Sequence, residues 1–600
     1  MKIVFVNPFD YVDIEKNSIP LGILSLASVL KQDDEFDVDI VDLHRVYSSR
    51  RLELDVHDLD YNIDESSKHI LSLSPDCVSI YTMNNTHHVA VMLAKRIKEL
   101  CPTTTIALGG PQATITAEET LLSFDFIDLI GLGEGEKTIR QIMRGIREKD
   151  FSNVLGVAFR ENGKVQLIEN NDLIDDLDAL PIIDLSFLKT DDIGEVVSID
   201  AGRGCPYSCT FCSTKSFWKR HFRVKSPQRI VDELEFYWKT YGIEQFSFQH
   251  DLFLANKKTV LNLCDLIERR NLRIKWWCSS RIDTIDEEMI RKMSSAGCNS
   301  IYFGVEVGTQ RMQRIINKNL KLDQMQHLIS LLQKYNISPT FSFIYGFPEE
   351  TYEDVDGTLE YIYNIYEAYL KLFTKDNVSI QLHKLVFLPQ TEVTQKVFDK
   401  LSIEEDYHID ASLSIDKWNN PFLKKMIVEN KPIFSHYYDL NTELRNNLDN
   451  LDIAFNTIFV NFIRYVDVTY KLMYVASGRS NLRLYLKMKE ILSEKEILEC
   501  RHYNYRTLGQ FVDKMFSLFE KIAKSHMFGD YNDGIVDMFS FEREIYNFEI
   551  KSNNNQSLKY RKRYNHDVIE MKKRRDGIVL KTNIEIEMYA RNGTASARKI

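Results

Sequence analysis

Three cysteines stand close together near the middle of the chain. Cys205, Cys209 and Cys212 are separated by three and then two residues. Three thiolates on one loop can hold three irons of a [4Fe-4S] cluster, since such clusters are normally bound by four cysteines. The fourth iron then stays open to a chelating cofactor, and radical chemistry with S-adenosylmethionine (SAM) is one known use of such a centre. The alternative is a structural zinc site, which needs four closed ligands, and no further Cys or His pair with zinc spacing lies near.

A run of alternating strands and helices must position this cysteine loop. From Val196 onward a strand pattern followed by a helical pattern repeats six times, and the cysteine loop follows the first strand through Gly202-Arg203-Gly204. This order predicts a partial or full (β/α) barrel, whose chemistry belongs at the carboxyl ends of the strands. The predicted strands are Val196 to Asp200, Gln245 to Gln249, Ile274 to Cys278, Ser300 to Val305, Thr340 to Tyr345 and Ser379 to Leu385.

The first part of the chain shows a similar alternation. Its continuous apolar runs predict a five-strand α/β domain with a doubly wound parallel sheet. In such sheets ligands bind outside the carboxyl ends of the strands, and the turns there are rich in glycine. The predicted strands are Ile3 to Val6, Val38 to Val41, Cys77 to Tyr81, Thr105 to Leu108 and Ile127 to Ile130.

Four segments follow from these patterns. We expect an α/β domain over 1–150, a linker over 151–190 with a hairpin turning at Glu161-Asn162-Gly163, the barrel over 191–400, and a mostly helical accessory domain over 401–600. The Tyr and Phe residues of the last segment fit either a core or an aromatic substrate groove. The predicted fold class is therefore α/β with a helical C-terminal domain.

Composition excludes several classes of protein. The 600 residues are 44% hydrophobic and 27% charged, and the net charge of -11 gives no case for a dedicated nucleic-acid binder. No run of about 18 apolar residues occurs, so we expect no membrane span. Nine cysteines, an odd number and mostly scattered, do not form a disulfide framework, so we expect a protein of the reducing cytoplasm.

The residues Cys205, Cys209, Phe211 and Cys212 match the signature of the radical SAM family, and they follow the first barrel strand as in that family. The resemblance implies a [4Fe-4S] cluster that reduces SAM to a 5′-deoxyadenosyl radical, which abstracts hydrogen from an unactivated carbon. It also implies a SAM pocket with Phe211 near the adenine, Arg281 on the SAM carboxylate, Glu306 on the amino or ribose groups, and Asp251 and Gly346 nearby. Without the resemblance, Arg281 could form a surface ion pair, Glu306 could be a buried structural acid, and Asp251 a capping residue.

The N-terminal domain indicates which group of radical SAM enzymes the chain resembles. Ile19 to Ala27, Gly109 to Thr114 and Gly131 to Glu136 resemble the cobalamin-binding half of cobalamin-dependent radical SAM enzymes. Small residues there let a flat corrin approach the backbone closely. The cobalamin contacts that the resemblance implies are Leu21, Gly22, Gly109, Gly110, Pro111, Gln112, Gly133 and Glu134.

The sequence departs from the family pattern in three places. The motif Asp-x-His-x-x-Gly is absent, and Asp42-Leu43-His44 and Asp55-Val56-His57 share only its first three letters, so we expect cobalamin to bind without a protein His ligand. Gln112 replaces a His that is common after Gly-Gly-Pro, and loss of cobalamin stays open. Gln390 stands where the family's turn at the sixth strand usually has Gly.

Together these observations predict a cobalamin-dependent radical SAM enzyme, a C-methyltransferase that acts on an unactivated carbon of a natural-product or peptide substrate. SAM would serve both as methyl donor and as radical source, and a flavodoxin or ferredoxin would supply electrons. The alternatives are cyclisation or rearrangement without methyl transfer, and a radical SAM enzyme that has lost cobalamin. An RNA methylthiotransferase is disfavoured because such enzymes carry three further cluster cysteines in the N-terminal domain, whereas only Cys77 and Cys101 precede the barrel here. A non-catalytic binding protein is disfavoured because it would have no reason to keep three exposed thiols.

Overall fold

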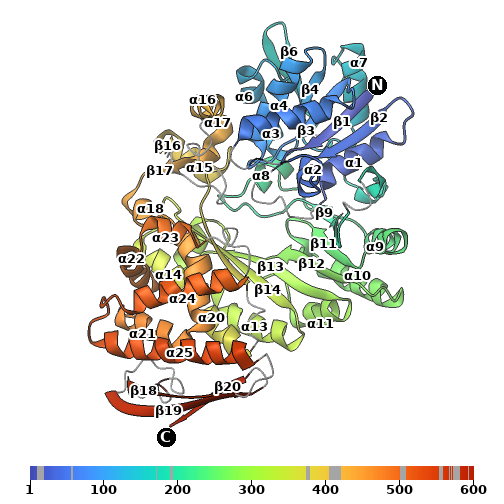
Figure 1. Cartoon of the computed structure of the whole chain (residues 1–600). Coiled ribbons are helices and arrows are strands. Elements are labelled where there is room, and N and C mark those ends of the chain that lie inside the picture. Colours follow the sequence, from blue (N-terminus) through green and yellow to red (C-terminus); the bar gives the residue numbers. More distant parts are fainter. Residues whose placement is uncertain are drawn as a thin grey trace.

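The protein is described by a computed structural model. It describes residues 1–9, 19–53, 55, 58–170, 172–188, 193–372, 379–403, 420–500, 508–552, 558–566, 568, 571, 581–591 and 594–599. Figure 1 shows the N-terminal α/β domain at the top, the barrel below it and the C-terminal helices at the lower left.

The N-terminal domain is built on a seven-stranded sheet of order β2-β1-β3-β4-β5-β6-β7. Its first five strands are parallel and are the five that the apolar runs predict, with ends within two residues. Helices cover both faces, which explains why these strands are apolar without alternation. The strands are β1 (Lys2–Asn7), β2 (Asp37–Asp42), β3 (Cys77–Tyr81), β4 (Thr105–Gly109), β5 (Leu129–Gly131), β6 (Val157–Glu161) and β7 (Lys164–Ile168).

The predicted hairpin forms, and it extends this sheet. Strands β6 and β7 are antiparallel and joined by Asn162 and Gly163, both with positive φ (50° and 77°). Two central residues with positive φ make the turn whose twist matches antiparallel strands. The segment expected as a linker therefore begins as the edge of the N-terminal domain. The helices of this domain are α1 (Leu21–Leu30), α2 (Leu43–Ser48), α3 (Leu59–Leu71), α4 (His87–Leu100), α5 (Pro111–Ile115), α6 (Ala117–Ser123) and α7 (Ile139–Glu148).

The barrel is a six-stranded, fully parallel sheet of order β15-β14-β13-β12-β11-β8. The prediction of a partial (β/α) barrel is confirmed, since the first and last strands do not pair. The strands are β8 (Val196–Asp200), β11 (Gln245–Gln249), β12 (Lys275–Ser280), β13 (Cys298–Glu306), β14 (Ser338–Tyr345) and β15 (Ser379–Lys384), with a two-residue ribbon of β9 (Gly202–Arg203) and β10 (Arg223–Val224) beside them.

Local sequence signals begin and end the barrel helices. Helix α9 begins at Ser226, whose hydroxyl accepts the Arg229 N–H, has Pro227 in its first turn, and ends at Gly242 with a φ of 70°. The helices are α8 (Thr214–Trp218), α9 (Pro227–Tyr241), α10 (Lys257–Arg269), α11 (Glu287–Ser295), α12 (Gln310–Ile315), α13 (Met325–Lys334) and α14 (Tyr352–Leu372).

The chain after the barrel divides between two cores. The described apolar residues of 385–403 and 420–440 share a hydrophobic core with the N-terminal domain, whereas the helices from α19 onward share the core of the barrel. Figure 1 shows α15 to α17 beside the N-terminal domain, away from the later helices. The first group contains α15 (Glu392–Val397), β16 (Leu401–Ile403), α16 (Pro421–Glu429), α17 (Lys431–Phe434), the 3-10 turn η8 (Ser435–Tyr437) and β17 (Tyr438–Leu440).

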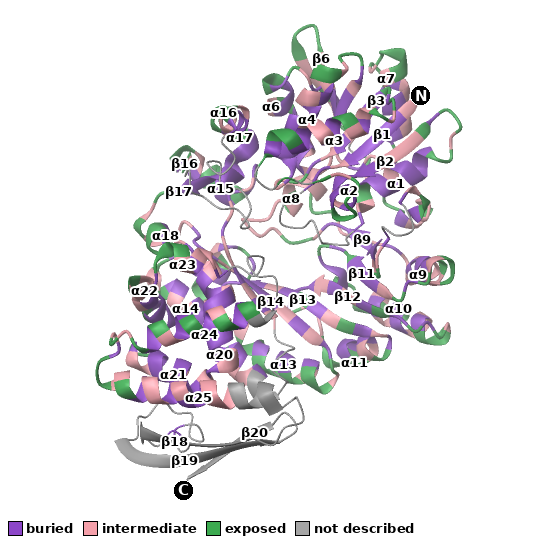
Figure 2. Cartoon of the chain, viewed as in Figure 1, coloured by how far each residue is buried: buried purple, intermediate pink, exposed green. Residues whose placement is uncertain are grey.

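The helical layer that follows is packed through aromatic side chains. Tyr366, Tyr369, Phe459, Phe462 and Phe519 are all buried in the core shared with the barrel. Figure 2 shows buried stretches along α14, α20 and α24. These rings therefore form core. The elements are α18 (Glu443–Asn447), α19 (Leu451–Ile453), the π-helical η9 (Ala454–Phe459), α20 (Val460–Tyr465), α21 (Asp467–Ala476), α22 (Asn481–Ile491), α23 (Glu494–Leu498), α24 (Leu508–Ala523), α25 (Asn532–Ser552), β18 (Leu558–His566), β19 (Lys581–Arg591) and β20 (Thr594–Lys599). None of the helices described above is long and apolar enough to cross a membrane.

Candidate active site

The carboxyl ends of the two parallel sheets border one cavity of about 720 Å³. The N-terminal domain contributes the start of α1, the end of β3 and the turns after β4 and β5. The barrel contributes the cysteine loop and the ends of β11, β12 and β13. We call it the central cavity. Because each sheet places its ligand edge there, one space serves both predicted cofactor sites.

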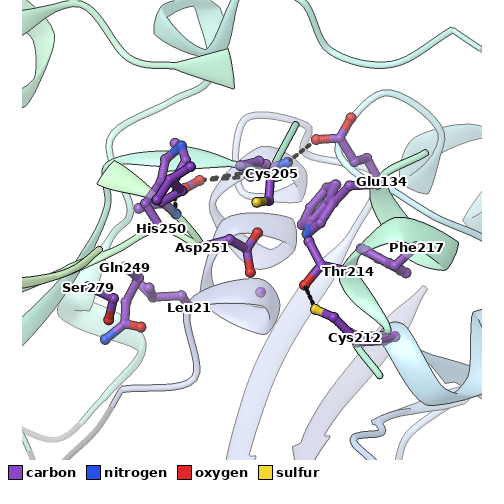
Figure 3. Close-up of a pocket in the computed structure, with 18 of the residues that line it drawn as sticks. Leu21, Glu134, Cys205, Cys212, Thr214, Phe217, Gln249, His250, Asp251 and Ser279 are labelled. Atoms are coloured by element: carbon purple, nitrogen blue, oxygen red, sulfur yellow. Dashed lines mark hydrogen bonds and ion pairs between the residues drawn. The ribbon is translucent and has the colours of Figure 1, made fainter. Parts of the chain in front are cut away.

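The three cysteines lie together on the wall of the central cavity. Cys205, Cys209 and Cys212 all line it and are half-buried. In Figure 3 the sulfurs of Cys205 and Cys212 and the carboxylate of Asp251 point toward the same space. The loop needs Gly204, which has a φ of 83° and whose Cβ would lie 1.8 Å from a backbone oxygen. The Cys212 thiol donates to the Thr214 hydroxyl at 3.1 Å, which sets its side-chain direction.

These thiols fit an iron-sulfur cluster. Burial raises the pKa of Cys209 to about 11, and burial also raises the pKa of Cys205, so the thiolates need a bound cation. The nearby charges of Lys318 and Arg281 act in the opposite direction on the Cys209 pKa. Within the described ranges, no three His, Cys, Asp or Glu side chains are close enough to hold a single metal ion. Three separated thiolates suit a cluster that offers each of them its own iron.

Arg281 offers an unused donor to the central cavity. Its Nε and Nη2 bind the Asp283 carboxylate at 2.9 Å each, and Nη2 also donates to the Lys318 carbonyl. Its Nη1 is buried and has no hydrogen-bond partner among the described residues, and the guanidinium lies 3.8 Å from the Tyr207 ring centre. A buried guanidinium nitrogen without a partner is suited to a carboxylate, the group that SAM carries.

Glu306 is held in an unusual backbone conformation at the end of β13. Its φ is 72°, and the pairing of β13 with β14 shifts register between Gly304 and Glu306. The carboxylate pairs with Lys318 at 2.6 Å, and a Cβ on Gly304 would lie 2.4 Å from it. An irregular, left-handed backbone that aims an acid into a cavity is typical of functional sites.

Asp251 and His250 hold the cysteine loop from the next strand. Asp251 accepts the Gly204 N–H at 3.1 Å and also lines the central cavity, and burial raises its pKa. His250 accepts the Leu252 N–H on Nδ1, and its Nε2 donates to the Arg223 carbonyl. Burial lowers the pKa of His250 to about 4. The neutral ring uses both nitrogens and has none left for a metal.

The glycine turns form a cradle on the opposite wall. A Cβ on Gly109 or Gly133 would meet no atom within 4 Å, so each glycine leaves space open where a side chain would project. Gly110 has a φ of 97° and lies so close to the Thr82 carbonyl that a Cβ would come within 2.7 Å. This flat, side-chain-free surface fits a corrin. The other lining residues predicted here are Leu21, Gly22, Pro111 and Glu134.

Two predicted contacts lie outside the cavity lining. Gln112 is buried and donates to the Ile433 carbonyl at 2.8 Å, so its side chain joins α5 to the C-terminal segment. The Gly346 carbonyl accepts from Arg445, and its N–H binds Glu350. Phe211 does line the cavity and packs edge-on against Phe347. Of the two Asp-x-His pairs, Val56 and His57 lie outside the described residues, and His44 lines a neighbouring cavity of about 420 Å³.

Sequence reasoning missed several lining residues. Tyr207, Thr214, Arg203 and Lys318 lie on the cavity wall. Tyr207 and Thr214 stand within two residues of a cluster cysteine, which could have drawn attention to them. Lys318 had no such signal, because only the packing of the loop after α12 brings it to Glu306.

Comparison with known proteins agrees with the predictions for the barrel and for the N-terminal domain. The radical SAM superfamily matches residues 199–362, and the B12 binding domain matches residues 12–143. The chain is 30% identical over 350 residues to "Uncharacterized methyltransferase PH0819" of Pyrococcus horikoshii, which covers 57% of this chain and 72% of the relative. It is 26% identical over 374 residues to the anaerobic magnesium-protoporphyrin IX monomethyl ester cyclase of Cereibacter sphaeroides, covering 60% of this chain and 59% of the relative.

Solved structures share the fold. The cobalamin-dependent SAM radical enzyme OxsB aligns with a TM-score of 0.59 at 16% identity, over 92% of this chain and 80% of that one. The radical SAM methyltransferase TsrM from Kitasatospora setae aligns with a TM-score of 0.55 at 17% identity, over 69% of this chain and 82% of that one. The two matched regions, the cysteine loop and the glycine cradle meet at one cavity, and the chain belongs to the radical SAM enzymes that carry a B12-binding domain and use a [4Fe-4S] cluster, SAM and cobalamin.

Proposed function

We propose that this enzyme is a C-methyltransferase that methylates an unactivated carbon of a natural-product or peptide substrate. The observation that carries the proposal is the single central cavity, whose walls are the cluster cysteines on one side and the glycine cradle on the other. Relatives with methyl-transfer names also support it, among them the P. horikoshii methyltransferase and the hopanoid C-3 methylase of Methylococcus capsulatus, the latter 25% identical over 305 residues.

Each side chain then has a defined task. When bound, the cluster cleaves SAM reductively to make a substrate radical, and cobalamin carries the methyl group. Cys205, Cys209 and Cys212 hold three irons, and Arg281 Nη1 orients the SAM carboxylate. Glu306, fixed by Lys318, receives the amino or ribose groups. Asp251 acts on the loop through the Gly204 N–H.

The cavity wall suits a substrate that is largely apolar. Leu26, Phe217, Trp218 and Tyr302 line the central cavity. Apolar walls exclude water, which protects a radical from side reactions.

We infer a small-molecule or peptide substrate, an electron donor such as a flavodoxin or ferredoxin, and a cytoplasmic setting. We propose the domains 1–150, 191–400 and 401–600, with 151–190 between the first two. The hairpin of 151–190 extends the N-terminal sheet, and the first part of 401–600 packs on the N-terminal domain.

A second candidate is cyclisation without methyl transfer. It is favoured by the similarity to the magnesium-protoporphyrin IX monomethyl ester cyclase, which equals or exceeds that to the hopanoid methylase in identity and aligned length. Both reactions would use the same cluster and SAM contacts, so only the fate of the SAM methyl group separates them.

The test is anaerobic reconstitution with iron, sulfide and hydroxocobalamin, followed by metal and corrin quantitation and incubation with SAM and a reductant. We expect about four irons and one corrin per chain, together with corrin-dependent S-adenosylhomocysteine and 5′-deoxyadenosine. The triple variant Cys205→Ala, Cys209→Ala, Cys212→Ala should lose the iron, whereas Cys101→Ala, outside the site, should keep it.

The products decide between the candidates without a known substrate. Corrin-dependent S-adenosylhomocysteine supports methyl transfer. Formation of 5′-deoxyadenosine alone, with corrin bound, would favour cyclisation or rearrangement. A cluster without corrin would contradict methyl transfer through cobalamin.

A further inference from the structure

We propose that five buried charged residues form a positioning device that sets the corrin cradle at a fixed distance from the cluster loop. These residues, which we call the interdomain charge network, are Glu134, Glu136, Asp200, Arg203 and Arg223. The inference rests on the proposed use of both cofactors at one cavity, and it assigns Glu134, expected from sequence to contact cobalamin, to the protein framework instead.

Arg203 is the centre of the network. Its Nη1 binds the Glu134 carboxylate at 2.8 Å, and its Nη2 binds the Glu136 carboxylate at 2.6 Å and that of Asp200 at 2.9 Å. Glu134 and Glu136 belong to the N-terminal domain, and Arg203 and Asp200 belong to the barrel. One guanidinium therefore joins the two domains, and its planar fork makes the geometry specific.

Arg223 adds a second connection at the other end of the cluster loop. Its Nη1 binds the second oxygen of Glu134 at 2.6 Å and the Ile174 carbonyl at 2.8 Å. Its Nε and Nη2 have no hydrogen-bond partner in the part of the chain that the structure describes, and the guanidinium carbon lies 5.5 Å from the centre of the Trp218 ring. The backbones of Arg203 and Arg223 are also opposite each other in the antiparallel β9–β10 ribbon. Both ends of the loop that carries the cysteines are thus held to Glu134.

The same carboxylates are joined to the corrin cradle. Glu134 and Glu136 alternate with Gly133 and Gly135 in the turn after β5. Glu136 also accepts the Ser25 hydroxyl of α1 at 2.8 Å, and a Cβ on Gly135 would lie 2.9 Å from Leu26. The network therefore links the turn and the first helix of the cradle to the residue that precedes Gly204 and Cys205.

Burial makes this arrangement rigid and selective. The side chains of all five residues are between 4% and 13% exposed. Burial opposes ionisation of Glu136, but Arg203 holds the pKa of that carboxyl below its usual value. Buried ion pairs add little net stability, and their best-attested use is to specify one arrangement over others. Here the specified arrangement is the placement of one cofactor wall against the other.

The test compares Arg203→Lys and Glu136→Gln with wild type after reconstitution with iron, sulfide and hydroxocobalamin. Lysine keeps the charge but lacks the planar fork with which Arg203 reaches the three carboxylates from two separate nitrogens. The readouts are iron and corrin content, and the magnetic interaction between the reduced cluster and cob(II)alamin measured by EPR. We expect both variants to bind both cofactors, with a weaker and more heterogeneous interaction, and corrin-dependent S-adenosylhomocysteine formation on the order of 100-fold lower.

The matched control is Lys31→Gln, which removes an exposed ion pair between α1 and Asp184 in the linker. It should match wild type in every readout. A Glu136→Asp variant, which keeps the charge but shortens the side chain, gives a milder form of the defect if Glu136→Gln does not fold.

The outcomes separate this inference from the proposed function. An unchanged magnetic interaction in Arg203→Lys and Glu136→Gln, with both cofactors bound, overturns the inference and leaves the function intact. Loss of corrin from Glu134→Gln with an unchanged interaction in the other variants would make Glu134 a cofactor ligand and also overturn it. A weakened interaction supports the inference even if the wild type transfers no methyl group, and a wild type without corrin overturns both.

Discussion

At the scale of single residues, two non-glycine residues adopt left-handed backbone for different reasons. Glu306 has a φ of 72°, and its carboxylate faces Lys318 in the central cavity. Gln390 has a φ of 61° in the turn after the last barrel strand, where the related family usually has glycine. Its side chain bonds only to Gln395 within the described structure. The strain at Glu306 accompanies a placed functional group, whereas the strain at Gln390 does not.

We therefore predict that Gln390→Gly stabilises the protein. A left-handed backbone costs an L-residue about 1 kcal/mol or more, and the added freedom of glycine in the unfolded chain offsets part of this gain. The expected increase in the free energy of unfolding is about 0.5 kcal/mol, measured by urea denaturation. Gln390→Ala keeps the strained backbone and should not gain stability. A lower stability for the glycine variant would contradict the argument.

The lower face of cobalamin gives a second prediction at this scale. His44 lines the neighbouring cavity, and its Nδ1 is buried with no hydrogen-bond partner within the described ranges. Tyr81 and Leu21 belong to the walls of both cavities. Because His44 lacks the motif of a cobalt ligand and His250 uses both nitrogens, we expect cob(II)alamin to bind without a protein nitrogen. The EPR spectrum of the bound cob(II)alamin should therefore be the same in wild type and His44→Ala. Nitrogen hyperfine splitting that disappears in this variant would identify His44 as a ligand.

At the scale of elements, α18 is fixed to the barrel by a buried arginine. Arg445 donates to the Gly346 carbonyl after β14 and to the Leu385 carbonyl after β15, and it pairs with Asp439. Arg445 and Asp439 are each 1% exposed. Lys384 also pairs with Asp439 at 2.8 Å, so this carboxylate has two cationic partners. The helical layer therefore meets the strand ends through charge as well as through apolar packing.

We predict that Arg445→Leu lowers the free energy of unfolding by about 3 kcal/mol. The loss comes from Asp439 and two carbonyls that stay buried with fewer partners, and it lies at the low end for buried pairs because Lys384 remains. Urea denaturation measures it. Lys425→Leu, which removes an exposed ion pair with Glu429, should change stability by no more than about 0.5 kcal/mol. Equal effects of the two substitutions would refute this view of α18.

At the scale of the whole molecule, the segment after the barrel closes back onto the N-terminal domain through histidines. His87 and His88 of α4 and His436 of η8 are buried, and His88 Nδ1 bonds to the Tyr437 hydroxyl at 2.8 Å. Burial lowers the pKa of His87 and His88 to about 3. Burial, together with the neighbouring His88 and His87, also lowers the pKa of His436 well below its usual value. All three are neutral where the chain is folded.

These three buried histidines make the free energy of unfolding fall in acid. A histidine whose folded pKa lies below its unfolded pKa of about 6.5 stabilises the fold fully above that pH, and the contribution is lost as the pH falls toward the folded pKa. Each such group adds a slope of about 1.4 kcal/mol per pH unit between roughly pH 6 and pH 4. We predict that His436→Phe has a shallower acid slope than wild type by this amount, measured by urea denaturation at several pH values. Parallel pH profiles would contradict the prediction.

Much of this architecture could be predicted from local patterns. Apolar runs predicted the parallel strands of both sheets, because strands covered on both faces have no polar alternation. The pair Asn162-Gly163 predicted the hairpin, because both residues tolerate positive φ. No local pattern indicated that this hairpin would extend the first sheet, or that the described apolar residues of 385–403 and 420–440 would join the core of the N-terminal domain.

The sequence by itself determined the chemistry of the molecule. The spacing of Cys205, Cys209 and Cys212 and the glycine turns are local features, and their geometry follows from a few adjacent residues. Only the tertiary structure decided which side chains meet across the domains. Glu134 and Arg203 are 69 residues apart, and Gln112 and Ile433 are 321 apart. Such contacts depend on how the two sheets and the later helices pack, and a buried carboxylate or amide takes the partner that this packing brings within hydrogen-bond distance.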